Sequence, residues 1–161
     1  MADVEQKITA SLLFTGPQHG KAEEALSFYT SVFDKSSTLG ILRYEAGEPE
    51  PEGSVKHAQF SLGNYVMMAM DSSFAHGFTF NEAVSFVVSC ENQEEIDYYW
   101  NKLTAGGQES MCGWLKDKYG VSWQIVPKIL GQLMSDPARS QRVMKAFIQM
   151  KKIDIQQLKD A

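Results

Sequence analysis

A duplicated segment constrains the fold of this chain more than any other feature. Residues 22–33 (AEEALSFYTSVF) and residues 93–103 (QEEIDYYWNKL) share two early glutamates followed by a pair of aromatic residues. An apolar, strand-like run precedes each copy, at residues 8–14 and 83–88, and glycine-punctuated segments rich in strand formers follow each. The repeat predicts that one strand–helix–strands unit occurs twice.

We therefore expect an α+β fold made of two βαβββ modules. The first module is predicted at residues 1–74 and the second at residues 75–127, together forming one compact domain. Residues 128–161 lie outside the repeat and are predicted to form a C-terminal helical extension. An apolar stripe in this extension could pack on the domain or on a second subunit; it consists of Val143, Ala146, Phe147 and Met150.

Composition excludes several classes of protein. Hydrophobic residues make up 43% and charged residues 22% of the 161 positions, which is typical of a globular protein. The net charge of −5 argues against a nucleic-acid partner, and no apolar run is long enough to span a membrane. The opening MADVEQK is polar and lacks the features of a signal peptide, so we expect a cytoplasmic protein in which Cys90 and Cys112 are free thiols.

The motifs carried by the repeat resemble a known family. KAEEALSFYTSVF, GSVKHAQFSLGN, GFTFNEAVSFVVSC and GWLKDKYGVSWQIVP resemble the PhnB-like family of the vicinal-oxygen-chelate superfamily, which includes glyoxalases, bleomycin-resistance proteins and extradiol dioxygenases. The resemblance runs from about residue 8 to residue 127. It implies a cup-shaped mixed sheet of the glyoxalase/bleomycin resistance/dihydroxybiphenyl dioxygenase type, with helices outside. It also implies a homodimer, the commonest closed assembly.

PhnB-like proteins are often labelled 3-demethylubiquinone-9 3-methyltransferase. Most enzymes that use S-adenosylmethionine carry a glycine-rich loop after the first strand of a doubly wound sheet. Here the turn after the first strand is TGPQHGK, and βαβββ modules follow. We therefore expect the label to describe a family and not the chemistry of this chain.

The resemblance also predicts where a metal would bind in the metal-dependent members of the superfamily. The corresponding positions are Thr9, Met67, Ala83 and Gln124, and only the last carries a usable donor. Because a catalytic metal needs about three protein ligands, we expect no metal and no other cofactor. An atypical site made of His57, Gln59 and Gln124 remains an alternative.

Strand alternation predicts which residues face the cup. The helix-facing residues should be Ala10, Leu12, Phe14, Ala58, Phe60 and Leu62. The predicted ligand pocket then consists of Thr9, Ser11, Leu13, His57, Gln59, Ser61, Met67, Ser85, Cys112, Trp114 and Gln124. A largely apolar lining with a few convergent polar groups is typical of a small-molecule pocket.

Several pocket residues have both a functional and a structural interpretation. His57 is the candidate catalytic acid or base, or else a structural histidine bonded to Gln59 or Ser61. Trp114 could stack on a planar or cationic ligand or fill the core. Cys112 is a nucleophile only if a base or cation stabilises its thiolate, and otherwise a small buried hydrophobe.

Two functional hypotheses follow. The first is a protein that binds a small molecule in its cup without a metal, in the manner of bleomycin-resistance proteins. The second is a lyase, isomerase or oxygenase of the glyoxalase type, with His57 as base and a metal held atypically. A third possibility is an interaction protein whose extension mediates assembly.

Overall fold

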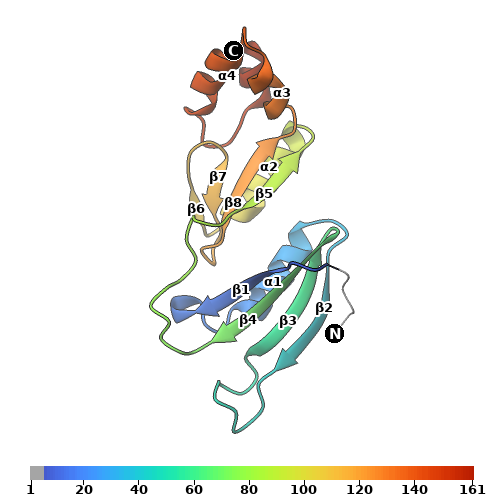
Figure 1. Ribbon diagram of the computed structural model, residues 1–161, viewed down its shortest axis with the longest axis vertical. Helices are drawn as coiled ribbons and strands as arrows, with labels where there is room; N and C mark the ends of the chain where they lie inside the picture. The colour runs from blue at the N-terminus through green and yellow to red at the C-terminus, as the bar shows by residue number, and fades with distance from the viewer. Residues whose placement is uncertain (1–5) are drawn as a thin grey trace. The chain divides into compact units, whose positions relative to one another are not determined.

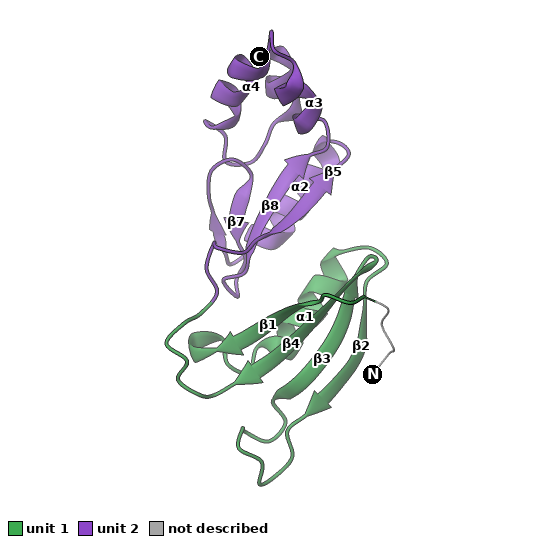
Figure 2. Cartoon of the chain, viewed as in Figure 1, with its two compact units in different colours: residues 1–79 green, residues 80–161 purple. Residues whose placement is uncertain are grey.

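The computed structural model describes residues 6–161, which form two compact units (Figures 1 and 2). The first unit ends at Thr79 and the second runs from Phe80 to Ala161. The predicted helical extension is part of the second unit. Each unit is described by itself below.

The first unit consists of a four-stranded sheet and one long helix. Its elements are β1 (Ala10–Thr15), the 3₁₀ turn η1 (Gly16–Gln18), α1 (Ala22–Val32), β2 (Ser37–Arg43), β3 (Val55–Leu62) and β4 (Tyr65–Ser72). The strand order is β1-β4-β3-β2, with β1 parallel to β4 and the other pairs antiparallel. Gly63, with a φ of 59°, lies in the turn of the β3–β4 hairpin.

The second unit repeats this plan and adds three helices. Its sheet contains β5 (Phe86–Cys90), β6 (Gln108–Glu109), β7 (Trp114–Lys116) and β8 (Ser122–Pro127), with α2 (Gln93–Thr104) after β5. The order β5-β8-β7-β6 matches the first sheet strand for strand, again with a parallel first pair. The predicted βαβββ duplication is therefore confirmed.

One face of each sheet carries a helix and forms the core. Ala22, Ala25, Leu26, Tyr29 and Val32 are the buried residues of α1, and the Tyr29 ring lies 6.4 Å from that of Phe60 on β3. In the second unit α2 buries Ile96, Trp100 and Leu103. Asn92 caps α2, since its side chain accepts a hydrogen bond of 2.9 Å from the Glu95 backbone N–H.

The extension completes the core of the second unit. It comprises α3 (Leu130–Ser135), α4 (Ser140–Phe147) and α5 (Ile155–Asp160). Ile153 and Leu158 are fully buried, and the Gln93 side chain of α2 bonds to the backbone of both Ile153 and Ile155. Of the two options open for the predicted stripe, packing on the chain's own second module is observed for Val143, which is fully buried.

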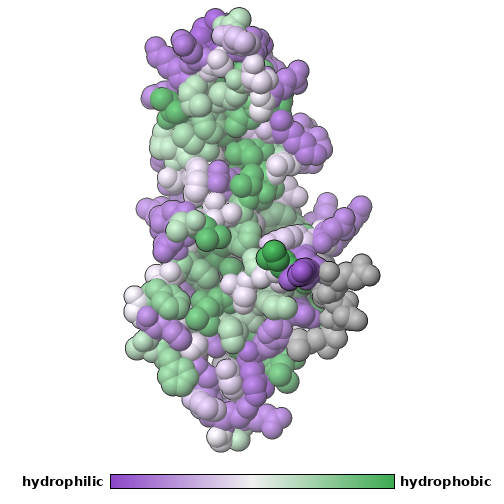
Figure 3. All heavy atoms as spheres, in the orientation of Figure 1, coloured by the Kyte–Doolittle hydropathy of each residue, from purple (hydrophilic) through white to green (hydrophobic). Residues whose placement is uncertain are grey.

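Among residues 6–161, no helix combines the length and apolar character needed to cross a membrane. Hydrophobic residues nevertheless reach the surface of both units, as the face drawn in Figure 3 shows. The large apolar side chains more than half exposed are Ile8, Phe74, Phe78, Val84 and Val87.

Candidate functional site

The candidate site consists of the helix-free faces, which are the sheet faces opposite α1 and α2. Directly paired residues on neighbouring strands share a face, so the register identifies the members of each face. On the first sheet these are Ser11, Leu13, Thr15, Ser37, Gly40, Leu42, His57, Gln59, Ser61, Val66, Met68, Met70 and Ser72. Thr9 lies just before β1, where its hydroxyl is 3.4 Å from Gln6 Nε2.

The prediction that Met67 faces the cup is wrong. Met67 pairs with Phe60 on β3 and with Ala10 on β1, and it is 1% exposed on the helix side of the sheet. The next residue, Met68, takes the predicted place beside Gln59 and Ser11. The run 66–70 is apolar at every position, so it contains no alternation from which its face could be predicted.

Gln59 is a deeply buried polar residue of the first helix-free face. Its side chain is 7% exposed, and its Oε1 atom has no hydrogen-bond partner among the described residues. It lies between Met68 on β4 and Gly40 on β2. The register shifts between Thr38 and Gly40, so a strand irregularity lies next to this position.

His57 lies on the same face as Gln59 and is half-buried. Its cross-strand neighbour is Leu42. The Ser61 hydroxyl approaches Ser37 Oγ at 3.4 Å, and the Gln59 oxygen is unpaired, so neither forms the expected structural bond to His57.

The second sheet brings together three of the predicted pocket residues. Trp114 pairs with Gln124, and the Gln124 Nε2 donates to Ser85 Oγ at 2.9 Å. Trp114 is half-buried, in contrast to Trp100 and Trp123, which are 3% and 2% exposed. Trp123 belongs to the core of the second unit.

Trp114 borders a hollow of about 150 Å³ on the second unit. Polar groups surround it, and its other lining residues are Glu82, Gln108, Glu109, Ser110, Leu115 and Lys116. Lys116 forms an ion pair with Glu82, 61% of whose side chain is exposed. The hollow therefore combines one indole with an ion pair, Lys116–Glu82, whose partly exposed groups are available to a ligand.

Cys112, which was predicted to face the cup by strand alternation, lies in a turn where alternation does not apply. It occupies the turn before β7 with a φ of 60°, and its backbone N–H donates to the Met150 carbonyl at 2.7 Å. This left-handed conformation, followed by Gly113, breaks the alternation that the prediction assumed. The other thiol, Cys90, is fully buried at the end of β5, and burial raises its pKa to about 12, with a smaller contribution from Glu95.

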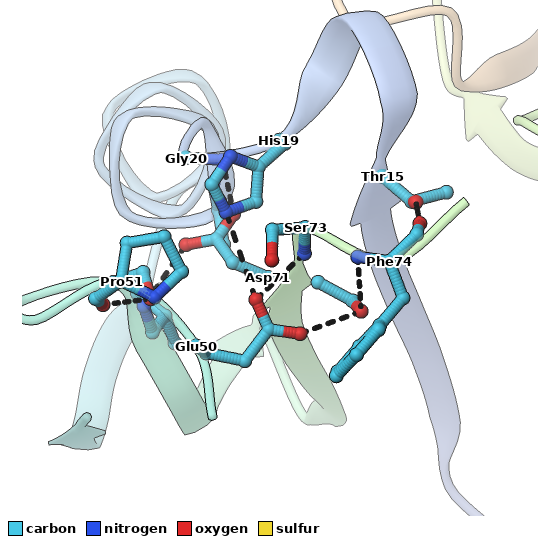
Figure 4. A network of polar contacts seen from close by, with 12 residues as sticks. Thr15, His19, Gly20, Glu50, Pro51, Asp71, Ser73 and Phe74 are labelled. Carbon is cyan, nitrogen blue, oxygen red and sulfur yellow. Dashed lines mark hydrogen bonds and ion pairs between the residues drawn. The ribbon is translucent and has the colours of Figure 1, made fainter. Parts of the chain in front are cut away.

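A buried acidic cluster in the first unit was not predicted. Glu50 belongs to an acidic Pro/Gly loop, residues 45–52, yet it is 5% exposed and accepts bonds from Ser72 Oγ at 2.8 Å and the Ser73 N–H at 2.7 Å (Figure 4). His19 Nε2 lies 4.0 Å from its carboxylate. Burial by itself raises the pKa of Glu50, but these hydrogen bonds and His19 together bring the pKa below its ordinary value.

Asp71 is a second carboxylate that the sequence reasoning missed. It is 1% exposed at the end of β4 and accepts bonds from the backbone N–H groups of Gly20, Ala22 and Val55. Asp71 thus satisfies donors at the start of α1, where the helix has no cap of its own. An acidic residue within an apolar strand was the signal available in the sequence.

The side chains at the positions implied for a metal do not fit one. Ala83 has no donor and is exposed, Met67 lies under α1, and Gln124 donates its amide to Ser85. Within residues 6–161, no three His, Cys, Asp or Glu side chains are grouped closely enough to hold a metal ion. No catalytic step is therefore derived through a metal.

Two mixed sheets of identical order, each covered by a helix on one face, define an α+β protein of the glyoxalase/bleomycin-resistance type, the fold of the vicinal oxygen chelate superfamily. The model of the 3-demethylubiquinone-9 3-methyltransferase family matches residues 6–126, and the chain belongs to this family. A search of curated proteins found no match.

Solved structures agree with this assignment. A PhnB protein from Bacillus cereus, also described as a 3-demethylubiquinone-9 3-methyltransferase, is 46% identical; the match covers 76% of this chain and 99% of that chain, with a TM-score of 0.71. Protein PA1353 from Pseudomonas aeruginosa is 23% identical over 76% of this chain and 98% of its own, with a TM-score of 0.63. The fosfomycin resistance protein FosX from Listeria monocytogenes shares the fold at 11% identity and a TM-score of 0.52, covering 81% and 98% of the two chains.

Proposed function

We propose that this protein binds a small organic molecule on the helix-free faces of its sheets, without the divalent metal of the metal-dependent superfamily members. The observation that carries the proposal is the half-buried Trp114 beside a hollow of about 150 Å³. An indole face next to a hollow offers a stacking surface for a planar group, and the polar rim can orient it.

The composition of the first sheet supports the same function. Its helix-free face combines apolar Leu13, Met68 and Met70 with the polar side chains of His57 and Gln59. Thioether side chains adapt to the shape of a ligand, whereas a few fixed polar groups supply specificity.

Tryptophan fluorescence tests binding directly. Trp114 is the accessible indole, so a ligand at the hollow should change its emission. We expect hits from a chemically diverse fragment library to quench the wild-type protein, and Trp114→Phe to abolish the response. Trp123→Phe, which removes a buried indole whose N–H bonds to Asp117 outside the hollow, is the matched control and should keep it. A response that survives in Trp114→Phe would show that the hollow is not the site.

Elemental analysis tests the metal-independent part of the proposal. Protein purified without chelator should contain far less than one divalent metal per chain, because the implied positions offer one amide donor. A stoichiometric metal would contradict this part and favour the enzymatic alternative.

A glyoxalase-type enzyme is the second candidate, with His57 as acid or base. It is favoured by one observation: His57 shares its face with the unpaired Gln59 and has no structural bond to Ser61. Turnover of a bound compound should then be lost in His57→Asn and kept in His76→Asn. Equal turnover in the two variants would remove this role.

We do not propose methyl transfer. The turn after β1 is a single 3₁₀ turn, Gly16–Gln18, and each sheet has four strands in mixed orientation. These features differ from the glycine-rich loop and doubly wound sheet that bind adenosyl cofactors in most methyltransferases.

A further inference from the structure

Four residues form one lateral row across the first helix-free face. Ser11 pairs with Met68, Met68 with Gln59, and Gln59 with Gly40, so the row crosses β1, β4, β3 and β2. Ser11 is exposed, Met68 is half-buried, and Gln59 is 7% exposed. A buried amide thus lies next to a position that has no side chain.

The buried amide oxygen in this row, Gln59 Oε1, has no hydrogen-bond partner among the described residues, which is rare for a buried polar atom. Leaving a buried acceptor unpaired costs stability, so such an atom in a folded protein calls for an explanation. One explanation is that a bound molecule supplies the missing donor. This explanation also accounts for the residues next to Gln59.

The neighbouring strand is irregular where such a molecule would lie. Gly40 has no side chain to cover Gln59, and a register shift lies between Thr38 and Gly40. Glycines inside strands often mark a place where a ligand comes close, and strand irregularities are frequent next to active sites.

Charge on this face limits the chemistry of the molecule. None of the four row members, Ser11, Met68, Gln59 and Gly40, carries a carboxylate, an ammonium or a guanidinium group. The Glu50 carboxylate bonds to Ser72, which lies on the same face but four residues further along β4 than Met68. An ionic ligand would find no fixed countercharge within the row.

We propose that Gln59 is a specificity-determining residue for an uncharged, planar ligand that donates an N–H or O–H group to its Oε1 atom while its apolar part lies over Met68 and Gly40. The inference rests on the proposed function and adds the ligand's class and orientation to it. It also explains why the protein keeps a buried amide that lowers its stability: the amide is needed for binding.

Matched probes test this directly. Indole and 1-methylindole differ in one N–H, as phenol and anisole differ in one O–H. With ¹³C-methyl methionine labelling, all four should shift the Met68 and Met70 signals, and each donor should bind about 3- to 10-fold more tightly than its methylated partner. Gln59→Met should remove the difference within each pair.

The free protein provides a readout that needs no ligand. Replacing an unpaired buried amide by a thioether of similar size should raise the Tm of Gln59→Met by about 2–4 °C. Gln141→Met, on the exposed side of α4, is the matched control and should leave the Tm unchanged.

The outcomes separate the two proposals. If no probe shifts Met68 or Met70, the proposed function fails for this sheet and the inference fails with it. If donors and methylated partners bind equally well, only the inference fails. A fall of several degrees in the Tm of Gln59→Met would overturn the claim that the amide is unpaired in the free protein.

Discussion

Buried carboxylates hold the backbone of both units at sharp transitions. Asp71 accepts three backbone N–H groups from the start of α1 and of β3. In the second unit, Asp117 accepts the N–H groups of Tyr119 and Val121 and the indole N–H of Trp123. Each carboxylate supplies more acceptor sites than any neutral side chain of its size could.

Asp71→Asn should therefore destabilise the protein. An amide in the same place presents a donor to at least one backbone N–H, which leaves a buried donor unpaired at a cost of about 1–3 kcal/mol. Urea unfolding of the variant measures this loss. Asp160→Asn, at an exposed position, is the control and should change the free energy of unfolding by no more than about 0.5 kcal/mol. A loss no larger than that of the control would contradict the structural role of Asp71.

The two thiols should differ sharply in reactivity. A pKa of about 12 leaves about one Cys90 in 10,000 as thiolate at pH 8, and the side chain is fully buried. In a Cys112→Ser variant, iodoacetamide should not modify the native protein but should modify it fully in denaturant. Mass spectrometry measures the extent of labelling in the native and denatured states. Rapid labelling of native Cys112→Ser would contradict the burial of Cys90, because the end of β5 would then have to open.

At the scale of elements, Glu50 anchors the loop between β2 and β3. Its carboxylate bonds to Ser72 and Ser73 at the end of β4 and lies close to His19 from the turn before α1. Three separate segments of the first unit therefore meet at one buried acid (Figure 4).

The stability that Glu50 contributes should depend on pH. Since its folded-state pKa is below the ordinary 4.5, the contribution is present above pH 4.5 and is lost as the pH falls through the folded-state pKa. Glu50→Gln should unfold at lower urea than wild type at pH 7, with a difference that shrinks below pH 4.5. Glu52→Gln, an exposed neighbour, should show no such difference. A difference independent of pH would contradict ionisation as the cause.

The predictability of each strand's face depended on its alternation. Strand β3 alternates in polarity, and strand β8 has a large aromatic residue, Trp123, next to the polar Gln124. The faces of both strands are as predicted. Met67 was misplaced because its strand is apolar at every position, and Cys112 because a left-handed residue interrupts the strand pattern. The burial of Glu50 depends on Ser72 and Ser73, which are distant in sequence, so an acidic Pro/Gly loop contained no local sign of it.

At the scale of the whole molecule, the two units share a sheet plan but differ in how their cores are closed. Among the described residues of the first unit, the α-helix that closes the core is α1, whereas the second unit also uses residues beyond β8. Backbone bonds join this extension to the β6–β7 turn, from Cys112 to Met150 and from Gly113 to Lys151.

The extension should therefore contribute to folding. Ile153→Ala removes a fully buried side chain and should cost about 2–4 kcal/mol of unfolding free energy. Ile148→Ala, where 47% of the side chain is exposed, should cost much less. Equal losses in urea unfolding would mean that the extension does not share the core of the second unit.

The packing of Ile153 and Leu158 has a practical consequence for recombinant work on this family. The region matched by the family stops at residue 126, so a gene fragment cloned to that boundary would code for a second module without its last core side chains. Such a product would present a hydrophobic surface to its neighbours and accumulate in inclusion bodies. Expression clones should therefore be bounded by the folding unit, through residue 161, even when only the region matched by the family is of interest.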